Sequence, residues 1–315
     1  MRRILLKILH LYVIISTANK YGPSSVHIRD NYYSRLLQIK YLFKDYVFKR
    51  KYKVVEYRLE FQQELTFVLP FAYWHYLNGT LEKTISCKYT KELYFFSPNH
   101  EERYEKRLAR LPKKRFDYPN MFHCRTFRKD KWAMVPLKER YQNQVLVFEK
   151  PMLIIANKYN TEWGNGPINY FSIPVLDRII REYGEKYQVV YNRPSNGHIT
   201  MDNSEILELN EIDYIRKNHP HVILAEDLYR KHKGLANNYN HFQLLLYANC
   251  SHFISVHGGT AALASYFGGV NIIYSKRGHE HIFKEFETIF PALSGAKVLH
   301  AKKEQEVFGY LQEHY

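Results

Sequence analysis

The chain has 315 residues, of which 45% are hydrophobic and 24% charged, so its composition excludes a disordered protein and predicts two domains of ordinary size. Its net charge of +15 suits polyanionic partners, but the basic residues are spread along the chain and predict no arm for nucleic acid. The three widely spaced cysteines include no Cys-x-x-Cys pair, which excludes a disulfide framework and predicts reduced thiols in a cytoplasmic protein.

The first half of the chain predicts a small Rossmann-like domain with irregular elements. Residues 1–16 are basic and then apolar, and too few to span a bilayer, so we expect a buried first element; a helix lying on a membrane surface is the alternative. Residues 61–77 have helical spacing despite Pro70. Residues 92–96 predict a strand, and 101–111 a charged helix.

A polar stretch flanked by prolines, near residues 140–150, marks the expected boundary between the domains 1–145 and 146–315. Beyond it, short apolar runs alternate with helical patterns. The predicted strands are 152–156, 188–191, 222–225, 252–256 and 271–274. The predicted helices are 173–183, 240–248, 260–267 and 302–315, the last of them free to pack back on the first domain. This alternation predicts an α/β fold with a parallel sheet.

Ligands of open parallel sheets bind beyond the carboxyl ends of the strands. The polar residues that follow the predicted strands are therefore candidate site residues. They are Asn157, Lys158, Asn192, Arg193, Glu226, His257 and Ser275. Polar strand ends are common in any folded protein, so the joint enrichment in cations and amides counts for more than any one residue.

The sharpest motif is His257-Gly258-Gly259-Thr260, which joins a buried strand to a helix rich in small residues. Glycines let the backbone approach a ligand closely, and free N–H groups at a helix start bind phosphate. Thr260 could cap the helix or contact the phosphate. The alternative is a tight strand-helix joint capped by Thr260, with no ligand.

Several common nucleotide motifs are missing from the sequence. Neither G-x-G-x-x-G nor G-x-x-x-x-G-K-[ST] occurs, which disfavours hydride transfer and NTP hydrolysis. No Asp-x-Asp pair occurs either, so we expect a diphosphate neutralised by protein cations, without a metal ion or other cofactor.

The segment from about 150 to 300 resembles the donor-binding domain of GT-B glycosyltransferases, similar to those of bacterial surface polysaccharides and of large viruses. The residues that carry this resemblance are the helix 240–248, the strand and glycine turn 250–260, and the segment 266–274, within about half of the chain. The resemblance implies two Rossmann-like domains facing across a cleft. It also implies a donor diphosphate held by the turn 258–260 and by a cation such as Arg193 or Lys158.

The same resemblance implies transfer of a hexose or pentose to a glycan or lipid-linked glycan, with peripheral contact at the cytoplasmic face of a membrane as an option. The E-x7-E pattern of many retaining members is not evident, which favours inversion. The acceptor base is then expected in the first domain, and His100 and Glu101, after the predicted strand 92–96, are the candidates. A capped helix with a solvated His100 is the alternative. A non-catalytic nucleotide- or polyanion-binding protein, and another nucleotide-sugar enzyme such as an epimerase, are the competing functions.

Overall fold

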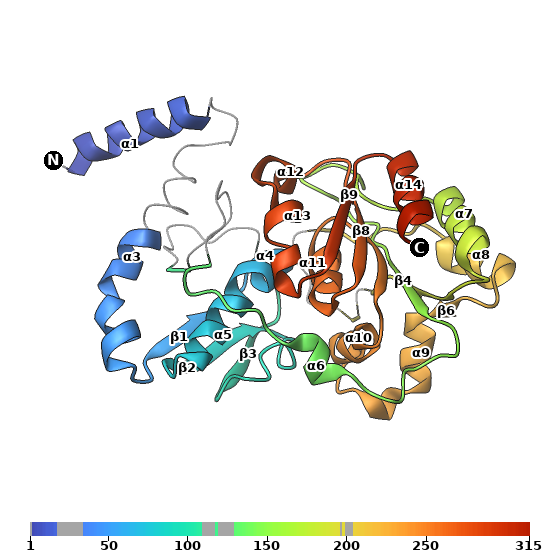
Figure 1. Ribbon diagram of the computed structural model, residues 1–315, viewed down its shortest axis with the longest axis horizontal. Helices are drawn as coiled ribbons and strands as arrows, with labels where there is room; N and C mark the ends of the chain where they lie inside the picture. The colour runs from blue at the N-terminus through green and yellow to red at the C-terminus, as the bar shows by residue number, and fades with distance from the viewer. Residues whose placement is uncertain (1, 18–33, 109–116, 119–128, 196, 199–203) are drawn as a thin grey trace.

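The computed structural model describes residues 2–17, 34–108, 117–118, 129–195, 197–198 and 204–315 (Figure 1). Two parallel sheets organise this part of the chain: one of three strands from the first half, and one of six strands from the second. The α/β class predicted from the sequence is confirmed. Helices α4 (Phe61–Gln63) and α11 (Gly259–Ala264) are in contact between the two sheets.

The three-stranded sheet has the order β1 (Lys53–Glu56), β2 (Leu81–Cys87) and β3 (His100–Tyr104). The connection from β1 to β2 is one helical run through α4, the π-helical η3 (Glu64–Val68) and α5 (Leu69–Leu77), as predicted for 61–77. Pro70 lies near the start of α5, directly after the π-helical η3.

Two predictions for residues 92–111 are wrong. Residues 92–96 form hydrogen-bonded turns, with Leu93 and Tyr94 donating backbone N–H groups to Thr90, because their aromatic side chains fill the core without extending the backbone. Residues 101–104 belong to strand β3 and not to a helix, while 109–111 lie outside the described residues. β3 borders the sheet, where charged side chains are tolerated, so it lacks the apolar alternation of a strand.

The six-stranded sheet has the order β6-β5-β4-β7-β8-β9, and every pairing is parallel. Its strands are β4 (Met152–Ala156), β5 (Gln188–Asn192), β6 (Ile223–Leu224), β7 (His252–Val256), β8 (Val270–Tyr274) and β9 (Lys297–Ala301). Numbered within this sheet, the order is 3-2-1-4-5-6, so the order reverses between β4 and β7. The predicted strands are present, although β6 is shorter than expected, and β9 was missed.

Helices cover both faces of the six-stranded sheet (Figure 1). They are α7 (Ile173–Tyr183), α8 (Glu211–Asn218), α9 (Ala225–Lys231), α10 (Tyr239–Ala248), α11, α12 (His279–Phe283), α13 (Glu285–Thr288) and α14 (Glu304–His314). Three single turns, η4 (Lys233–Leu235), η5 (Ser265–Phe267) and η6 (Pro291–Leu293), join them. α14 packs on the six-stranded sheet, where the Tyr315 hydroxyl bonds to the backbone of Phe253 and Val270.

One hydrophobic cluster contains side chains from both halves of the chain, from Val55 to Leu293. The halves are also joined by polar bonds. The Tyr266 hydroxyl donates to Leu65 O, and α6 (Leu137–Tyr141) packs on α10. A second cluster fills the opposite face of the six-stranded sheet, beneath α7 and α14. The division into domains 1–145 and 146–315 stays a prediction.

The N-terminal helix α1 (Arg2–Thr17) does not form the buried first element expected from the sequence. Its apolar side chains Ile4, Ile8, Leu11 and Ile15 are exposed. Helix α3 (Ser34–Lys40) and the π-helical turn η2 (Lys44–Phe48) follow. Among the described residues, no helix combines the length and the apolar character needed to cross a bilayer.

Candidate functional site

The reversal of strand order between β4 and β7 places two chain segments side by side at the carboxyl end of the sheet. The chain leaves β4 into Asn157 and Lys158, and leaves β7 into His257 and Gly258. A crevice at such a reversal is where open α/β sheets bind their ligands. The sequence-predicted residues that meet here are Lys158, His257, Gly258 and Ser275.

The turn after β7 depends on Gly258, whose φ of +103° and ψ of −152° are open to glycine alone. A Cβ atom on Gly258 would lie 3.5 Å from the Lys158 ammonium, which shows how closely that cation approaches the turn. A Cβ atom on Gly259 would lie 2.7 Å from a ring carbon of Phe61, so α4 of the first half approaches the same turn from the other side.

Thr260 does not cap helix α11, which was one of the two roles that the sequence allows it. The cap position is Gly258, so Thr260 lies one residue beyond the first helical position, where its side chain is partly exposed. Among the described residues, its hydroxyl has no hydrogen-bond partner in the structure. The cap position is two residues before Thr260, so the threonine hydroxyl is not placed to accept from the N–H groups of the first turn.

His257 is buried and held on both of its ring nitrogens. Nδ1 lies 3.0 Å from the Ser275 hydroxyl, and Nε2 lies 3.5 Å from a carboxylate oxygen of Glu280. Burial, followed by the charge of Lys158, lowers the pKa of His257 well below its usual value, so the imidazole is neutral at pH 7. Ser275 is fully buried and also lies 2.8 Å from Nε2 of His281.

Asn169 fixes the loop after β4 against the loop after β8. Its side-chain N–H₂ donates to Glu162 at 2.6 Å and to the Arg277 carbonyl at 2.9 Å. Its side-chain oxygen accepts the backbone N–H groups of Lys276 and Arg277 at 2.8 and 3.2 Å. Because Asn169 is buried, these bonds hold the two loops together at the reversal point.

Two cations lie near this reversal point. Lys158 forms an ion pair with Glu162 at 3.0 Å, while its side chain stays one-fifth exposed. The Arg277 guanidinium is exposed and lies 6.0 Å from the Trp163 ring centre, and it forms no ion pair with any carboxylate of the described residues. We call Lys158, Gly258 and Arg277 the switch-point cluster. It offers two cations and a glycine backbone to an anionic group.

Asn157 and Asn192 have structural roles. The Asn157 side chain bonds to the backbone of Phe171, and the Asn192 side chain bonds to Gln243, Tyr247 and Tyr239. Both side chains are buried, and these contacts use their bonding capacity. They hold strand ends in place and do not face a ligand.

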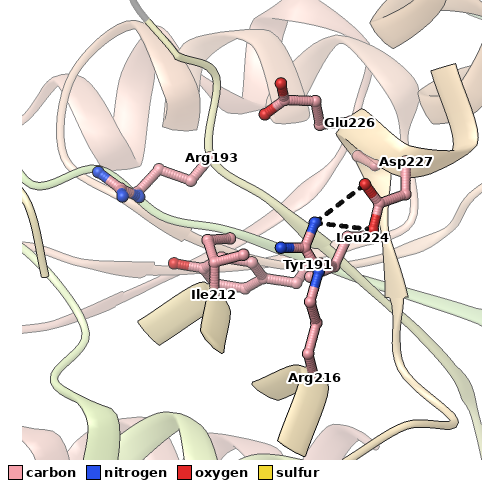
Figure 2. Close-up of a pocket in the computed structure, with 8 residues that line it drawn as sticks. Tyr191, Arg193, Ile212, Arg216, Leu224, Glu226 and Asp227 are labelled. Carbon is pink, nitrogen blue, oxygen red and sulfur yellow. Dashed lines mark hydrogen bonds and ion pairs between the residues drawn. The ribbon is translucent and has the colours of Figure 1, made fainter. Parts of the chain in front are cut away.

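Arg193 and Glu226 lie elsewhere, at a small pocket beyond β5 and β6 (Figure 2). Arg193 donates to the buried carboxylate of Glu211 at 2.5 Å and to Leu207 O at 3.1 Å. The pocket, with a volume of about 20 Å³, has room for about one water molecule. Across it, Arg216 binds Asp227, as the dashed lines in Figure 2 show. We call this the Arg193 pocket.

The base candidates lie on β3. His100 contacts the hydroxyls of Thr84 and Thr90 and stacks on Tyr94, and burial lowers its pKa to about 4. Glu101 is bound by Arg103 and Lys83, and hydrogen bonds from these two cations lower its pKa to about 2. Within the described residues, no hydrogen bond or ion pair joins either side chain to the switch-point cluster.

The candidate site residues chosen from the sequence do not include Glu162, Asn169, Arg277 and Glu280. Glu162 and Arg277 belong to the polar clusters that follow predicted strands, and Glu280 lies only a few residues past the cluster that begins at Ser275. Asn169 lies more than ten residues beyond β4, where no local pattern identifies it.

No family model, curated protein or solved structure matches the chain.

Proposed function

We propose that the chain is a glycosyltransferase that moves a sugar from a nucleotide-diphosphate sugar to a glycan or lipid-linked glycan hydroxyl, without a metal ion, in the cytoplasm. The observation that carries the proposal is the switch-point cluster. Lys158 approaches the Gly258 turn where a sheet of order 3-2-1-4-5-6 reverses. Arg277 lies 6.0 Å from the ring centre of Trp163, and that ring lies 5.6 Å from the ring of His257, the residue before Gly258. The resemblance of residues 150–300 to GT-B donor domains agrees with this position.

In this proposal the cluster receives the donor diphosphate. Negative charge grows on the diphosphate as the bond to the sugar breaks, so fixed cations stabilise the transition state more than the ground state. Neutral His257 adds no charge of its own, and its hydrogen bond to Ser275 holds the ring in place.

Inversion is the proposed stereochemical course, and it needs a base for the acceptor hydroxyl. The lowered pKa values of His100, about 4, and of Glu101, about 2, make both weaker bases at neutral pH than a group that titrates near 7. The donor half of the site therefore supports the proposal more strongly than the acceptor half.

A panel of nucleotide-diphosphate sugars tests the proposal through the melting temperature and through donor hydrolysis. We expect one nucleotide class to raise the melting temperature and its sugar donor to be hydrolysed slowly in water. A transferred sugar separates this function from epimerisation, which would return a changed donor. If no member of the panel shifts melting or is consumed, the proposal is wrong.

A further inference from the structure

The helical segment 34–48 is amphipathic, but it turns its polar face toward the protein and its apolar face outward, the reverse of a usual surface helix. Residues that face the protein follow a helical spacing and are mostly polar: Ser34, Gln38, Tyr41 and Asp45, with the half-buried Leu37 beside them. Residues at the complementary spacing are apolar and point outward. A surface helix of a water-soluble protein normally buries its apolar stripe. The reversal therefore indicates an apolar environment outside this segment.

The inward stripe is fastened to the fold. Ser34 donates to Tyr118 O at 2.6 Å, and Lys131 donates to both Gln38 and Asp45. Asp45 is fully buried and also accepts a hydrogen bond from Tyr52. These contacts fix which face of the segment looks outward, so the exposed apolar side chains are a property of the folded state.

The outward face gathers large apolar side chains over a short length. Their exposed fractions run from 49% to 68%. They are Ile39, Leu42, Phe43, Tyr46, Val47 and Phe48. Isolated exposed hydrophobic residues are ordinary, but a contiguous group of this size marks an interaction site. The segment lies on the side of the small sheet away from the six-stranded sheet (Figure 1).

The exposed charged side chains of residues 39–51 are all cations, and the exposed Asp130, which raises the pKa of Tyr46, is an acidic neighbour from outside this range. Exposed cations interleave with the apolar residues and continue past the end of η2. They are Lys40, Lys44, Lys49, Arg50 and Lys51. Asp45 is the only acidic residue between positions 34 and 55, and it points inward to Lys131. We call the exposed side chains of residues 39–51 the basic apolar patch.

We propose that the basic apolar patch docks on the surface of a membrane that contains anionic lipid. The apolar side chains would enter the boundary between headgroups and acyl chains, and the cations would pair with lipid phosphates and carboxylates. Charge complementarity selects this occupant, because a second copy of the chain would bring the same positive charges against the patch. The inference goes beyond the transferase proposal and does not depend on it.

Vesicle sedimentation with the full chain tests the proposal. We expect binding to vesicles of phosphatidylcholine mixed with phosphatidylserine, much weaker binding to phosphatidylcholine alone, and release at high salt. Each basic residue near an anionic surface strengthens binding about fivefold. The triple variant Lys49→Glu, Arg50→Glu, Lys51→Glu should therefore bind at least about 100-fold more weakly. Replacing Phe43, Val47 and Phe48 with Ser should reduce binding at least about tenfold.

Matched controls use exposed residues far from the patch. Lys217, Lys231 and Lys233 changed to Glu test the charge, and Val145 and Val147 changed to Ser test apolar area. All variants alter exposed side chains, so we expect melting temperatures close to that of the parent. A Phe48→Trp variant should gain fluorescence that lipids brominated in the acyl chain quench.

Three results would overturn the proposal. Patch variants that bind vesicles like the parent would assign membrane contact to another element, such as α1. Loss of self-association in patch variants, with no vesicle binding by the parent, would assign the patch to a second copy of the chain. Absence of added quenching in Phe48→Trp on bound vesicles would exclude insertion of η2. The assay contains no nucleotide, so its failure is separate from failure of the transferase proposal.

Discussion

The carboxyl edge of the six-stranded sheet has two basic clusters that differ in whether their positive charge is neutralised. In the Arg193 pocket the guanidinium is nine-tenths buried and its charge is matched by Glu211, a carboxylate with no exposure. In the switch-point cluster, Arg277 is exposed beside Trp163, and Lys158 keeps an exposed face despite its bond to Glu162. A cation after a strand can bind a ligand only if the fold leaves its charge available.

The largest expected effect separates the two clusters through stability. Arg193→Ala would leave Glu211 as a buried carboxylate whose remaining hydrogen-bond donor, among the described residues, is the Tyr191 hydroxyl. Removing one partner of a buried ion pair costs about 3–5 kcal/mol of unfolding free energy. Urea denaturation should show that loss, while nucleotide-diphosphate affinity of the folded variant stays near the parent value.

The matched control for that variant is Arg181→Ala. Arg181 pairs with Asp177 at 2.9 Å but is 69% exposed, so its removal should cost less than about 1 kcal/mol. Equal stability losses from the two variants would show that the Arg193–Glu211 pair is solvated. A large loss of nucleotide affinity in Arg193→Ala would return Arg193 to the donor site.

The next effect concerns His100, which the sequence proposed as the base. Its imidazole titrates near pH 6.5 in the unfolded chain and at about 4 in the folded one, because burial disfavours the charged ring. The stability that comes from the neutral ring is complete above pH 6.5 and is lost as the pH falls toward 4, by about 3 kcal/mol. Denaturation from pH 7 to 4 should therefore be less steep in His100→Gln. Parallel profiles for parent and variant would mean that His100 is solvated.

A smaller effect tests the exposed cation directly. Arg277→Ala should weaken nucleotide-diphosphate binding by about tenfold or more, since a hydrogen bond to a charged group contributes about 1.5–3 kcal/mol. Unfolding free energy should change by less than about 0.5 kcal/mol, because the side chain is exposed and the backbone bonds to Asn169 remain. Calorimetric titration measures the first, and Lys231→Ala, an exposed cation far from the cluster, is the control. Equal affinities in Arg277→Ala and Lys231→Ala would remove Arg277 from the site.

The smallest expected effect concerns removal of metal ions, which should leave the rate of sugar transfer unchanged. If cations of the chain neutralise the diphosphate, sugar transfer should keep its rate after treatment with EDTA. A rate that collapses with EDTA and recovers with Mn²⁺ or Mg²⁺ would contradict a metal-independent site.

The parts of the fold that could be predicted from the sequence are those that a local residue pattern specifies. Residues 152–156 are a continuous apolar run and 253–256 are apolar apart from Ser255, and both predicted strands, β4 and β7, are present. β3 was not predicted because an edge strand of charged residues shows no apolar alternation. The switch-point position of Lys158 and Gly258 came from the strand-end rule. The neutralisation of Arg193 depends on Glu211, 18 residues further along the chain, and only packing of α8 reveals it.

The measurement that tests the central claim most directly is calorimetric titration of UDP and GDP into the parent and into the double variant Lys158→Gln, Arg277→Ala. Glutamine keeps a donor for Glu162, so the double variant should remain folded. The parent should bind one of the two diphosphates, and the double variant should bind it about 100-fold or more weakly, as two lost charged contacts require. A parent that binds neither nucleotide, or a folded double variant that binds like the parent, would contradict a diphosphate site at the switch-point cluster.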